Sequence, residues 1–300
     1  MIIDAHIHLI SRQVRRLGRE RREGLNPRLA AIYNDHWNKH LSRSGDPMRE
    51  EEIPELKVVA GLWEKELEDS GVAAGVFLYP SDFNGDDMKE FVSYSPRFIG
   101  LSSHNPTLPE AEKLFAREID VLKGFKLYPE LHRYHADDER CFPVYKLAEE
   151  KGIPVYFHFG ICINVFHDIK YGNPLSLSGV CRNFPDLKIV VCHFGCNYFE
   201  NVLLLGRLYP GIHVDTSSSN NWTEILPYRL TLEEVFQKSI DILGPHRIIF
   251  GTDSSFFPRG FRKNILDIQR EIMEKLGLSE SDKELILSGN IIRLLNLDYS

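Results

Sequence analysis

Ile2-Ile3-Asp4-Ala5-His6-Ile7-His8 is a short apolar run that carries one acid and two histidines. Its β-branched residues favour a strand, and residues two apart on a strand point to the same side. His6 and His8 should therefore converge at the C-terminal end of this strand, while Ile3, Ala5 and Ile7 face the opposite way. Two imidazoles side by side can bind one cation, although a His-x-His pair also occurs by chance. Their position relative to the other strands decides whether they do.

Seven further runs of this kind follow, and longer amphipathic stretches separate them. The strands we expect are Ile2–His8, Ala73–Tyr79, Phe98–Ser103, Leu122–Tyr128, Pro154–Phe159, Lys188–His193, Ile212–Thr216 and Arg247–Thr252. The helices we expect are Pro54–Ser70, Asp86–Ser95, Leu108–Ile119, Pro143–Lys151, Leu175–Phe184, Phe199–Leu208, Leu232–Leu243 and Lys263–Lys275, with a final helix at about Ser281–Leu295. Such alternation is typical of βα units around a parallel sheet. Eight strands predict an α/β fold, a closed (β/α)8 TIM barrel, as one domain over residues 1–300.

Residues 11–52, between the first strand and the first helix, interrupt this rhythm. The segment begins with six arginines, at Arg12, Arg15, Arg16, Arg19, Arg21 and Arg22. Loops that follow barrel strands form the active-site face, so we expect this insertion to lie over the active site. Two interpretations stay open: a solvated helical excursion or oligomer contact, and a segment that contacts the substrate.

Three later strands also end in a polar residue. His158 follows Val155-Tyr156-Phe157, His193 follows Val190-Val191-Cys192, and Asp253 follows Phe250-Gly251-Thr252. In a barrel these ends surround one mouth, so they should meet His6 and His8 there. Histidines and a carboxylate suit a borderline divalent cation such as Zn²⁺, with an open position for water. A histidine beside that water can move a proton.

These motifs resemble the amidohydrolase superfamily. The His-x-His opening, the histidine after the fifth strand, His193-Phe194-Gly195 and Phe250-Gly251-Thr252-Asp253 are most similar to its amidohydrolase 2 branch, which is similar to aminocarboxymuconate-semialdehyde decarboxylase. The resemblance runs from Ile2 to the closing segment Gly289–Leu295. It implies one divalent metal, Zn²⁺ with Mn²⁺ as the alternative, bound by His6, His8, His158 and Asp253. It also implies that His193 and Asp253 are catalytic, unless His193 is a further ligand.

Lys126 and Tyr128 share one face at the end of the fourth strand. In binuclear members of the superfamily, a lysine at this place is carboxylated and bridges two metals. Because the branch usually works with one metal, we favour an unmodified Lys126 that binds an anionic group of the substrate. Tyr128, His104 and Arg259 are further candidate substrate-binding residues, since an arginine can bind a carboxylate bidentately.

Two other positions receive structural assignments. Asp215 and Ser217, which end the seventh strand, are expected to brace its turn. Cys192 has the opposite strand parity to His193, so it should face the surrounding helices.

Three functions remain open. A metal-activated water can hydrolyse an amide, ester or lactone of a small substrate that we expect to be anionic, or the metal can hold an unsaturated or aromatic acid for non-oxidative decarboxylation. The third function is a non-catalytic metal-binding barrel, which the full ligand set disfavours. Decarboxylases of this branch tend to follow the last aspartate with an aromatic residue and proline, whereas Ser254-Ser255-Phe256-Phe257-Pro258 follows it here. This departure favours the hydrolase.

Composition limits the partners. The net charge of -7 argues against a nucleic acid or an anionic membrane surface, so a small-molecule substrate is expected, with a homodimer as an open possibility. The five cysteines form no Cys-x-x-Cys pair, and the first residues lack the basic and apolar run of a signal peptide. Both features predict a cytoplasmic protein with reduced thiols.

Overall fold

The computed structural model describes residues 1–45, 47–79, 86–160, 165–217 and 222–298, apart from the side chains of 40–44. Eight parallel strands form its centre, in two sheets ordered β1-β2-β3 and β4-β5-β6-β7-β8. Their bounds are β1 (Ile3–His8), β2 (Ala74–Leu78), β3 (Phe98–Gly100), β4 (Phe125–Leu127), β5 (Val155–Phe157), β6 (Ile189–Val191), β7 (Ile212–Asp215) and β8 (Ile248–Ile249). Each lies inside an expected strand, so the sequence-based strand prediction is confirmed.

Backbone hydrogen bonds join the two sheets at both seams. Between β3 and β4, Ser102 N donates to Gly124 O at 2.9 Å and Lys126 N donates to Ser102 O at 2.7 Å. Between β8 and β1, Ala5 N donates to Phe250 O at 2.9 Å and Asp253 N donates to His6 O at 3.0 Å. These bonds close the eight strands into a barrel, and the second seam brings Asp253 directly beside the β1 histidines.

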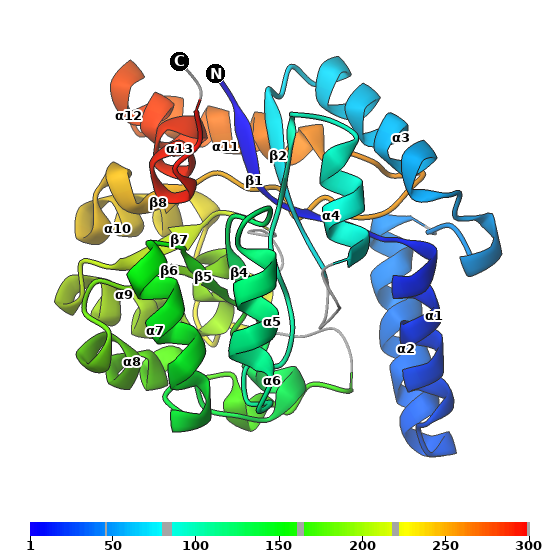
Figure 1. Ribbon diagram of the computed structural model, residues 1–300. Helices are drawn as coiled ribbons and strands as arrows, with labels where there is room; N and C mark the ends of the chain where they lie inside the picture. Colours follow the sequence, from blue (N-terminus) through cyan, green and yellow to red (C-terminus); the bar gives the residue numbers. More distant parts are fainter. Residues whose placement is uncertain (46, 80–85, 161–164, 218–221, 299–300) are drawn as a thin grey trace.

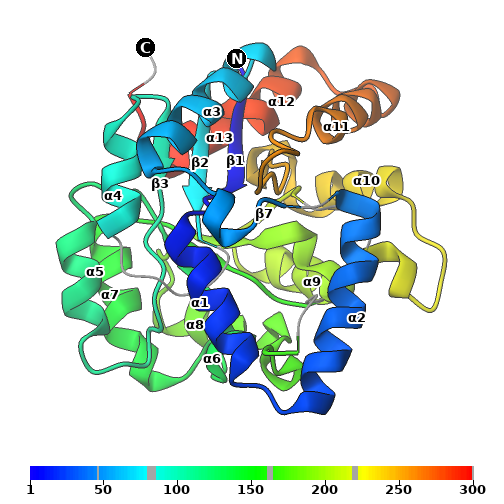
Figure 2. The same ribbon diagram turned by 90° about the vertical axis from the view of Figure 1, so that its right-hand side faces the viewer.

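Helices surround the barrel (Figures 1 and 2). They are α3 (Leu56–Asp69), α4 (Asp86–Ser93), α5 (Ala111–Glu118), α7 (Phe142–Lys151), α8 (Leu177–Asn183), α9 (Phe199–Leu208), α10 (Leu232–Leu243) and α11 (Lys263–Lys275), with a short α6 (Pro129–His132) after β4. Apolar side chains of the strands alternate between two layers. Val76 and Val190 pack inside the barrel, whereas Phe77 and Val191 pack outward against the helices. The fold is thus a (β/α)8 barrel with a core on each side of its sheet.

The end of the chain closes one end of the barrel. The expected final helix is present as α12 (Glu280–Glu284), a π-helical turn Leu285–Gly289 and α13 (Asn290–Leu295). Ile291 and Leu294 join the apolar cluster inside the barrel. Asn290 Nδ2 donates to Ile248 O at 2.7 Å, which fixes α13 to the start of β8. α13 therefore closes the barrel at the end where the strands begin, and the mouth lies at the opposite end.

The pairing of β1 differs from the expected alternation. Its register with β2 shifts between Asp4 and Ile7. As a result Ala5 packs inside the barrel and Ile7 packs in the outer layer, so the expectation that Ile3, Ala5 and Ile7 share one face is wrong. A bulge adds a residue to one strand and re-aims the side chains that follow. The Asp4 carboxylate supports it by accepting from His6 N at 2.9 Å.

The insertion after β1 is helical. It forms α1 (Arg12–Glu23), α2 (Pro27–Ser44) and a 3-10 turn Glu50–Glu52. Ser11 Oγ caps α1 by accepting from Val14 N at 3.2 Å. The ring of Tyr33 on α2 lies 5.6 Å from that of Phe166, in the segment after β5. The two helices extend beyond the C-terminal end of β1 (Figure 2), and the Tyr33–Phe166 contact joins α2 to the segment after β5.

Among the described helices, none is long and apolar enough to span a membrane. Cys141, Cys181, Cys192 and Cys196 are buried free thiols. Cys162 lies outside the described residues.

His213 on β7 allows a stability test. It is buried, and burial lowers its pKa from 6.5 to about 4. The unfolded chain binds the proton first as pH falls, so the stabilisation is complete above pH 6.5 and is lost as the pH approaches 4. Between about pH 8 and about pH 5 this group should lower the free energy of unfolding by about 2 kcal/mol. When the free energy of unfolding is measured with urea, it should fall over this pH interval by about 2 kcal/mol less in His213→Gln than in the wild type.

His36 on α2 is exposed, so His36→Gln serves as the matched control and should keep the wild-type pH dependence. An unchanged pH dependence in His213→Gln would contradict the assignment.

Candidate metal centre

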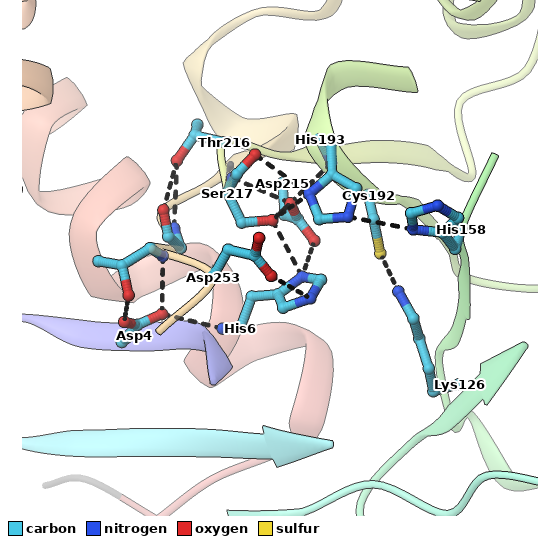
Figure 3. A network of polar contacts seen from close by, with 12 residues as sticks. Asp4, His6, Lys126, His158, Cys192, His193, Asp215, Thr216, Ser217 and Asp253 are labelled. Carbon is cyan, nitrogen blue, oxygen red and sulfur yellow. Dashed lines mark hydrogen bonds and ion pairs between the residues drawn. The ribbon is translucent and has the colours of Figure 1, made fainter. Parts of the chain in front are cut away.

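Asp253 and His6 lie side by side at the centre of the site (Figure 3), and His8 contacts Asp253 as well. Asp253 Oδ1 lies 3.0 Å from His8 Nε2 and 3.6 Å from His6 Nε2. Asp253 has a φ of 59°, in the left-handed region that a non-glycine residue enters at a cost. This turn directs the carboxylate back toward β1. Burial raises the pKa of Asp253, but the hydrogen bond from His8 and the neighbouring histidines outweigh it and hold the pKa well below its ordinary value.

Asp215 at the end of β7 orients His6. Its Oδ2 lies 2.9 Å from His6 Nδ1, so His6 Nε2 faces Asp253. That Nε2 is buried and has no hydrogen-bond partner among the described residues. Burial lowers the pKa of His6 to about 3, which leaves the imidazole neutral. A neutral, oriented imidazole with an unused nitrogen beside a carboxylate fits a divalent cation.

His193 lies between His6 and His158. Its ring centroid is 4.9 Å from that of His6 and 5.0 Å from that of His158, and its Nε2 is 3.2 Å from His158 Nδ1. Ser217 Oγ holds the other nitrogen, Nδ1, at 2.8 Å. Burial lowers the pKa of His193, so this imidazole is also neutral.

The five residues predicted to meet at the mouth are near one another or share partners. The ligand atoms of His6, His193 and Asp253 lie within 4.8 Å of one another, a spacing that suits one metal ion. His8 contacts Asp253, and His158 contacts His193. The geometry therefore keeps both sequence-based interpretations of His193, as a proton-transfer residue and as a further ligand.

Lys126 extends inside the barrel. It is completely buried, its Nζ donates to Cys192 Sγ at 2.6 Å, and it lies 5.2 Å from the centre of the Tyr128 ring. Cys192 packs in the inner cluster, so the expectation that it faces the helices is wrong. Cys192 continues the alternation of Val190 and Val191, and it is His193, with a φ of 58°, that departs from the strand alternation on which the expectation was based.

The remaining substrate-binding candidates have different surroundings. Tyr128 OH donates to Tyr79 O. The His104 ring packs 4.6 Å from Phe125, a residue of the outer layer. Their substrate contacts remain predictions.

Arg259 interacts electrostatically with Asp253. Its guanidinium stacks 4.2 Å over Phe256, and its Nη2 donates to Ser255 Oγ at 2.6 Å. Burial, with a contribution from Arg262, lowers the pKa of Arg259 to about 10, whereas Asp253 acts in the opposite direction. Its buried Nε has no hydrogen-bond partner among the described residues. The guanidinium thus retains a donor for an incoming anion.

Comparison with known proteins agrees with this architecture. The Amidohydrolase family (Amidohydro_2) matches residues 3–297. The chain belongs to this amidohydrolase family. It is 23% identical over 276 residues to 2-amino-3-carboxymuconate-6-semialdehyde decarboxylase of Dictyostelium discoideum, a match that covers 81% of this chain and 71% of the relative.

Solved structures resemble the amidohydrolase along its length. An uncharacterized TIM-barrel protein of Bordetella bronchiseptica has a TM-score of 0.69 at 22% identity, covering 99% of this chain and 98% of its own. A putative 2-pyrone-4,6-dicarboxylic acid hydrolase of Pseudomonas putida has a TM-score of 0.61 at 16% identity, covering 100% and 98%. A 5-carboxyvanillate decarboxylase of Novosphingobium aromaticivorans, complexed with manganese, has a TM-score of 0.67 at 14% identity, covering 99% and 96%. These likenesses show the shared fold.

Two carboxylates of the amidohydrolase make contacts at the site beyond those expected from the sequence. Asp215 orients His6 and also accepts from His193 N at 2.9 Å, beyond the turn that it was expected to brace. Its position at a strand end was the same signal that singled out His158. Glu130 on α6 is buried, with Oε2 at 4.0 Å from His158 Nε2 and 3.6 Å from His167 Nδ1. No strand-end signal marks it, because it lies beyond β4 in α6.

Removing the charge of Asp215 should weaken metal binding. In Asp215→Asn the oxygen that accepts from His6 Nδ1 loses its charge, and such orienting carboxylates contribute about 10- to 100-fold to metal affinity. Competition with a metal chelator should show a loss of this size. Asp267→Asn, an exposed site on α11, is the matched control and should bind metal as the wild type does. Equal affinity in both variants would contradict the role of Asp215.

Replacing His193 separates its two interpretations. If His193 transfers a proton, His193→Ala should keep its metal by elemental analysis and lose nearly all turnover. His6→Ala should lose the metal and serves as the reference for a missing ligand. A metal-free His193→Ala chain would instead make His193 a ligand.

Proposed function

We propose that this amidohydrolase is a metal-dependent hydrolase of a small carboxylate-bearing amide, ester or lactone. The observation that carries the proposal is the contact of Asp253 with both His6 and His8 beside a neutral His193. This arrangement combines candidate metal ligands with two groups able to accept protons. A non-catalytic barrel would not require it.

His6, His8, Asp253 and either His158 or His193 would hold the cation. When bound, a divalent metal lowers the pKa of a water molecule and polarises a substrate oxygen. Two observations support Zn²⁺ or Mn²⁺. The first is the oriented imidazole of His6, and the second is that solved structures of the same fold hold these metals. They are the manganese complex described above and a zinc-bound amidohydrolase of Burkholderia multivorans, which has a TM-score of 0.61 at 15% identity, with 99% of each chain covered. We propose one metal, because the two candidate ligand groups, His6–His193–Asp253 and His6–Cys192–Asp215, share His6, and Lys126 Nζ donates to Cys192.

The protein residues supply proton transfer and binding. Asp253 carries a carboxylate able to accept a proton from the attacking water, and His193 can pass that proton to the leaving group. Arg259 and Lys126 supply positive charge for an anionic substrate group, since a buried cation is stabilised by an opposite charge nearby. Ser217 keeps His193 in one orientation during the transfer.

Decarboxylation is the second candidate, and the curated relative favours it. That relative is named as a decarboxylase and matches 81% of this chain. The same residues could serve: the metal and Arg259 would hold the acid, and a proton from a protonated side chain would take the place of CO2 on the carbon. Both candidates need a carboxylate-bearing substrate, which also features in the name of the putative pyrone dicarboxylate hydrolase.

Isotopic labelling distinguishes the two reactions. The metal-loaded chain should be incubated with 2-pyrone-4,6-dicarboxylate and, separately, with 5-carboxyvanillate, in heavy-oxygen water and in deuterated water. Hydrolysis should place heavy oxygen in a new carboxylate, because water supplies that atom. Decarboxylation would instead give CO2 and a new carbon–deuterium bond. Mass spectrometry reads both, with Asp253→Asn as the inactive control.

A deuterated decarboxylation product without heavy-oxygen incorporation would replace the hydrolase proposal by the second candidate.

We also propose that the protein is cytoplasmic, which the four buried free thiols among the described residues support.

A further inference from the structure

A pocket lies at the opposite end of the barrel from the candidate metal centre, where the strands begin. Arg207 and Arg247 precede β7 and β8, whereas Asp215 and Asp253 stand at or beyond the C-terminal ends of these strands. The volume of this floor pocket is about 390 Å³, within the range of small-molecule sites, roughly 300–1,000 Å³. It is lined by Gly206, Arg207, Pro210, His213, His246 and Arg247.

The lining of the floor pocket is basic, although the whole chain has a net charge of -7. Its charged or titratable side chains are arginines and histidines, and among the described residues no carboxylate lines it. Burial lowers the pKa of His246, and Arg247 and Arg293 lower it further. The same two arginines also act on His213. These groups therefore repel one another's positive charge, and an anion between them would relieve that repulsion.

Arg207, in the last turn of α9, offers unused donors. Within the part of the chain that the structure describes, its guanidinium forms neither a hydrogen bond nor an ion pair. The side chain is exposed, so it can reach a ligand in the pocket without breaking a contact. All five of its N–H groups are available to such a ligand.

Arg247, on the other side of the pocket, is held in place by the ends of two helices. Its Nε donates to Leu243 O at 2.7 Å and its Nη2 to Ile242 O at 3.1 Å, both in the last turn of α10. Its Nη1 donates to Gly206 O of α9 at 2.7 Å. Carbonyl groups at helix C-termini attract a cation, and they fix this guanidinium. One N–H of Nη2 is not used by these bonds and remains for a ligand.

His246 is fixed by the turn that precedes β8. Gly244 has a φ of 74°, and a Cβ at this position would lie 2.6 Å from Cε1 of the imidazole. Only a glycine therefore lets the ring pack against the turn in this way. Arg293 Nη2 on α13 donates to the backbone O of His246 at 2.7 Å. The imidazole thus has a set position beside Arg247 and can donate to an anion.

The donors of the floor pocket suit a tetrahedral oxyanion. They come from α9 and from the turn before β8, so they approach the pocket from different sides. A phosphate group has several strong acceptor oxygens and carries up to two negative charges near neutral pH, which matches several donors and two arginines. Among the described lining residues there is no Phe, Tyr or Trp on which an aromatic ring could stack.

We propose that the floor pocket binds a phosphate group, with Arg207, His246 and Arg247 as its donors. In barrels of this kind the reaction takes place at the C-terminal ends of the strands, so this site is separate from the proposed reaction. A phosphate bound there would join α9 to the turn before β8 and would stabilise the folded chain. The phosphate can be the free ion or the phosphate group of a small metabolite.

Calorimetric titration of the metal-loaded chain tests the binding. The probes are inorganic phosphate, glycerol 3-phosphate and acetate, at one ionic strength set with chloride so that general screening stays constant. Inorganic phosphate or glycerol 3-phosphate should bind saturably, and acetate should bind at least about tenfold more weakly because it has one charge and fewer acceptor oxygens. Tighter binding of glycerol 3-phosphate would assign the site to phosphorylated metabolites, and tighter binding of inorganic phosphate would assign it to the free ion.

Variants locate the site. Arg207→Gln should raise the Kd of the tighter phosphate probe by about tenfold or more, and His246→Ala by about threefold or more. The matched control is Arg117→Gln, which removes the same charge from the last turn of α5 and should leave the Kd within about twofold. A phosphate bound at the metal centre would bind equally to all these chains, so the difference between wild type and Arg207→Gln reports the floor pocket.

Thermal unfolding gives a second measurement. Phosphate should raise the Tm of the wild type above its value in chloride at equal ionic strength, because a ligand that binds only the folded chain stabilises it. The rise should be smaller in Arg207→Gln and unchanged in Arg117→Gln. The Tm values in chloride also show whether each variant is folded.

Two results would overturn the proposal: a wild-type Kd in the folded Arg207→Gln and His246→Ala chains, or acetate binding as tightly as phosphate. Neither result depends on whether the metal centre catalyses hydrolysis or decarboxylation.

Discussion

The contact between Asp215 and His6 ties the site to the barrel. It joins the end of β7 to β1 across the inside of the molecule, and the other oxygen of Asp215 accepts from the backbone N of His193 after β6. Burial opposes the charge of Asp215, yet His6, His193 and Lys126 hold its pKa well below the ordinary value. A buried carboxylate with this many partners costs little to keep ionised and much to leave unpaired. The orientation of both imidazoles depends on it.

The architecture could be predicted because its signals are periodic. Each strand is an apolar run of the length that a buried parallel strand needs, and each helix has an amphipathic pattern, so α9, α10 and α11 begin and end at the expected residues. Polar residues at strand ends predicted the meeting of His6 and Asp253 for a simple reason. In a closed barrel all C-terminal strand ends surround one opening.

The errors arose where the backbone departs from regular strand geometry. The register shift in β1 moved Ile7 to the other face from Ala5, and the left-handed run that begins at His193 removed this histidine from the strand alternation that Cys192 still follows. Neither departure has a sequence signature as strong as a proline or a pair of glycines. Both depend on contacts with residues far away in the sequence, Asp4 in β1 with Thr252 and His193 with Asp215. Residues of the site are often strained in this way. The rule that residues two apart on a strand share a face therefore fails at the residues of the candidate site, where it is most often applied.

The closure of the barrel between β1 and β8 also determines when the protein becomes functional during its synthesis. His6 leaves the ribosome before β2 to β8 are synthesised, whereas Asp253 follows β8, and the helix that closes the barrel floor follows Asp253. A nascent chain therefore has no complete metal centre until β8 and Asp253 have been synthesised. Folds whose first and last strands must pair have many contacts between distant residues and fold slowly. Acquisition of the metal is thus a late event, coupled to the completion of the fold.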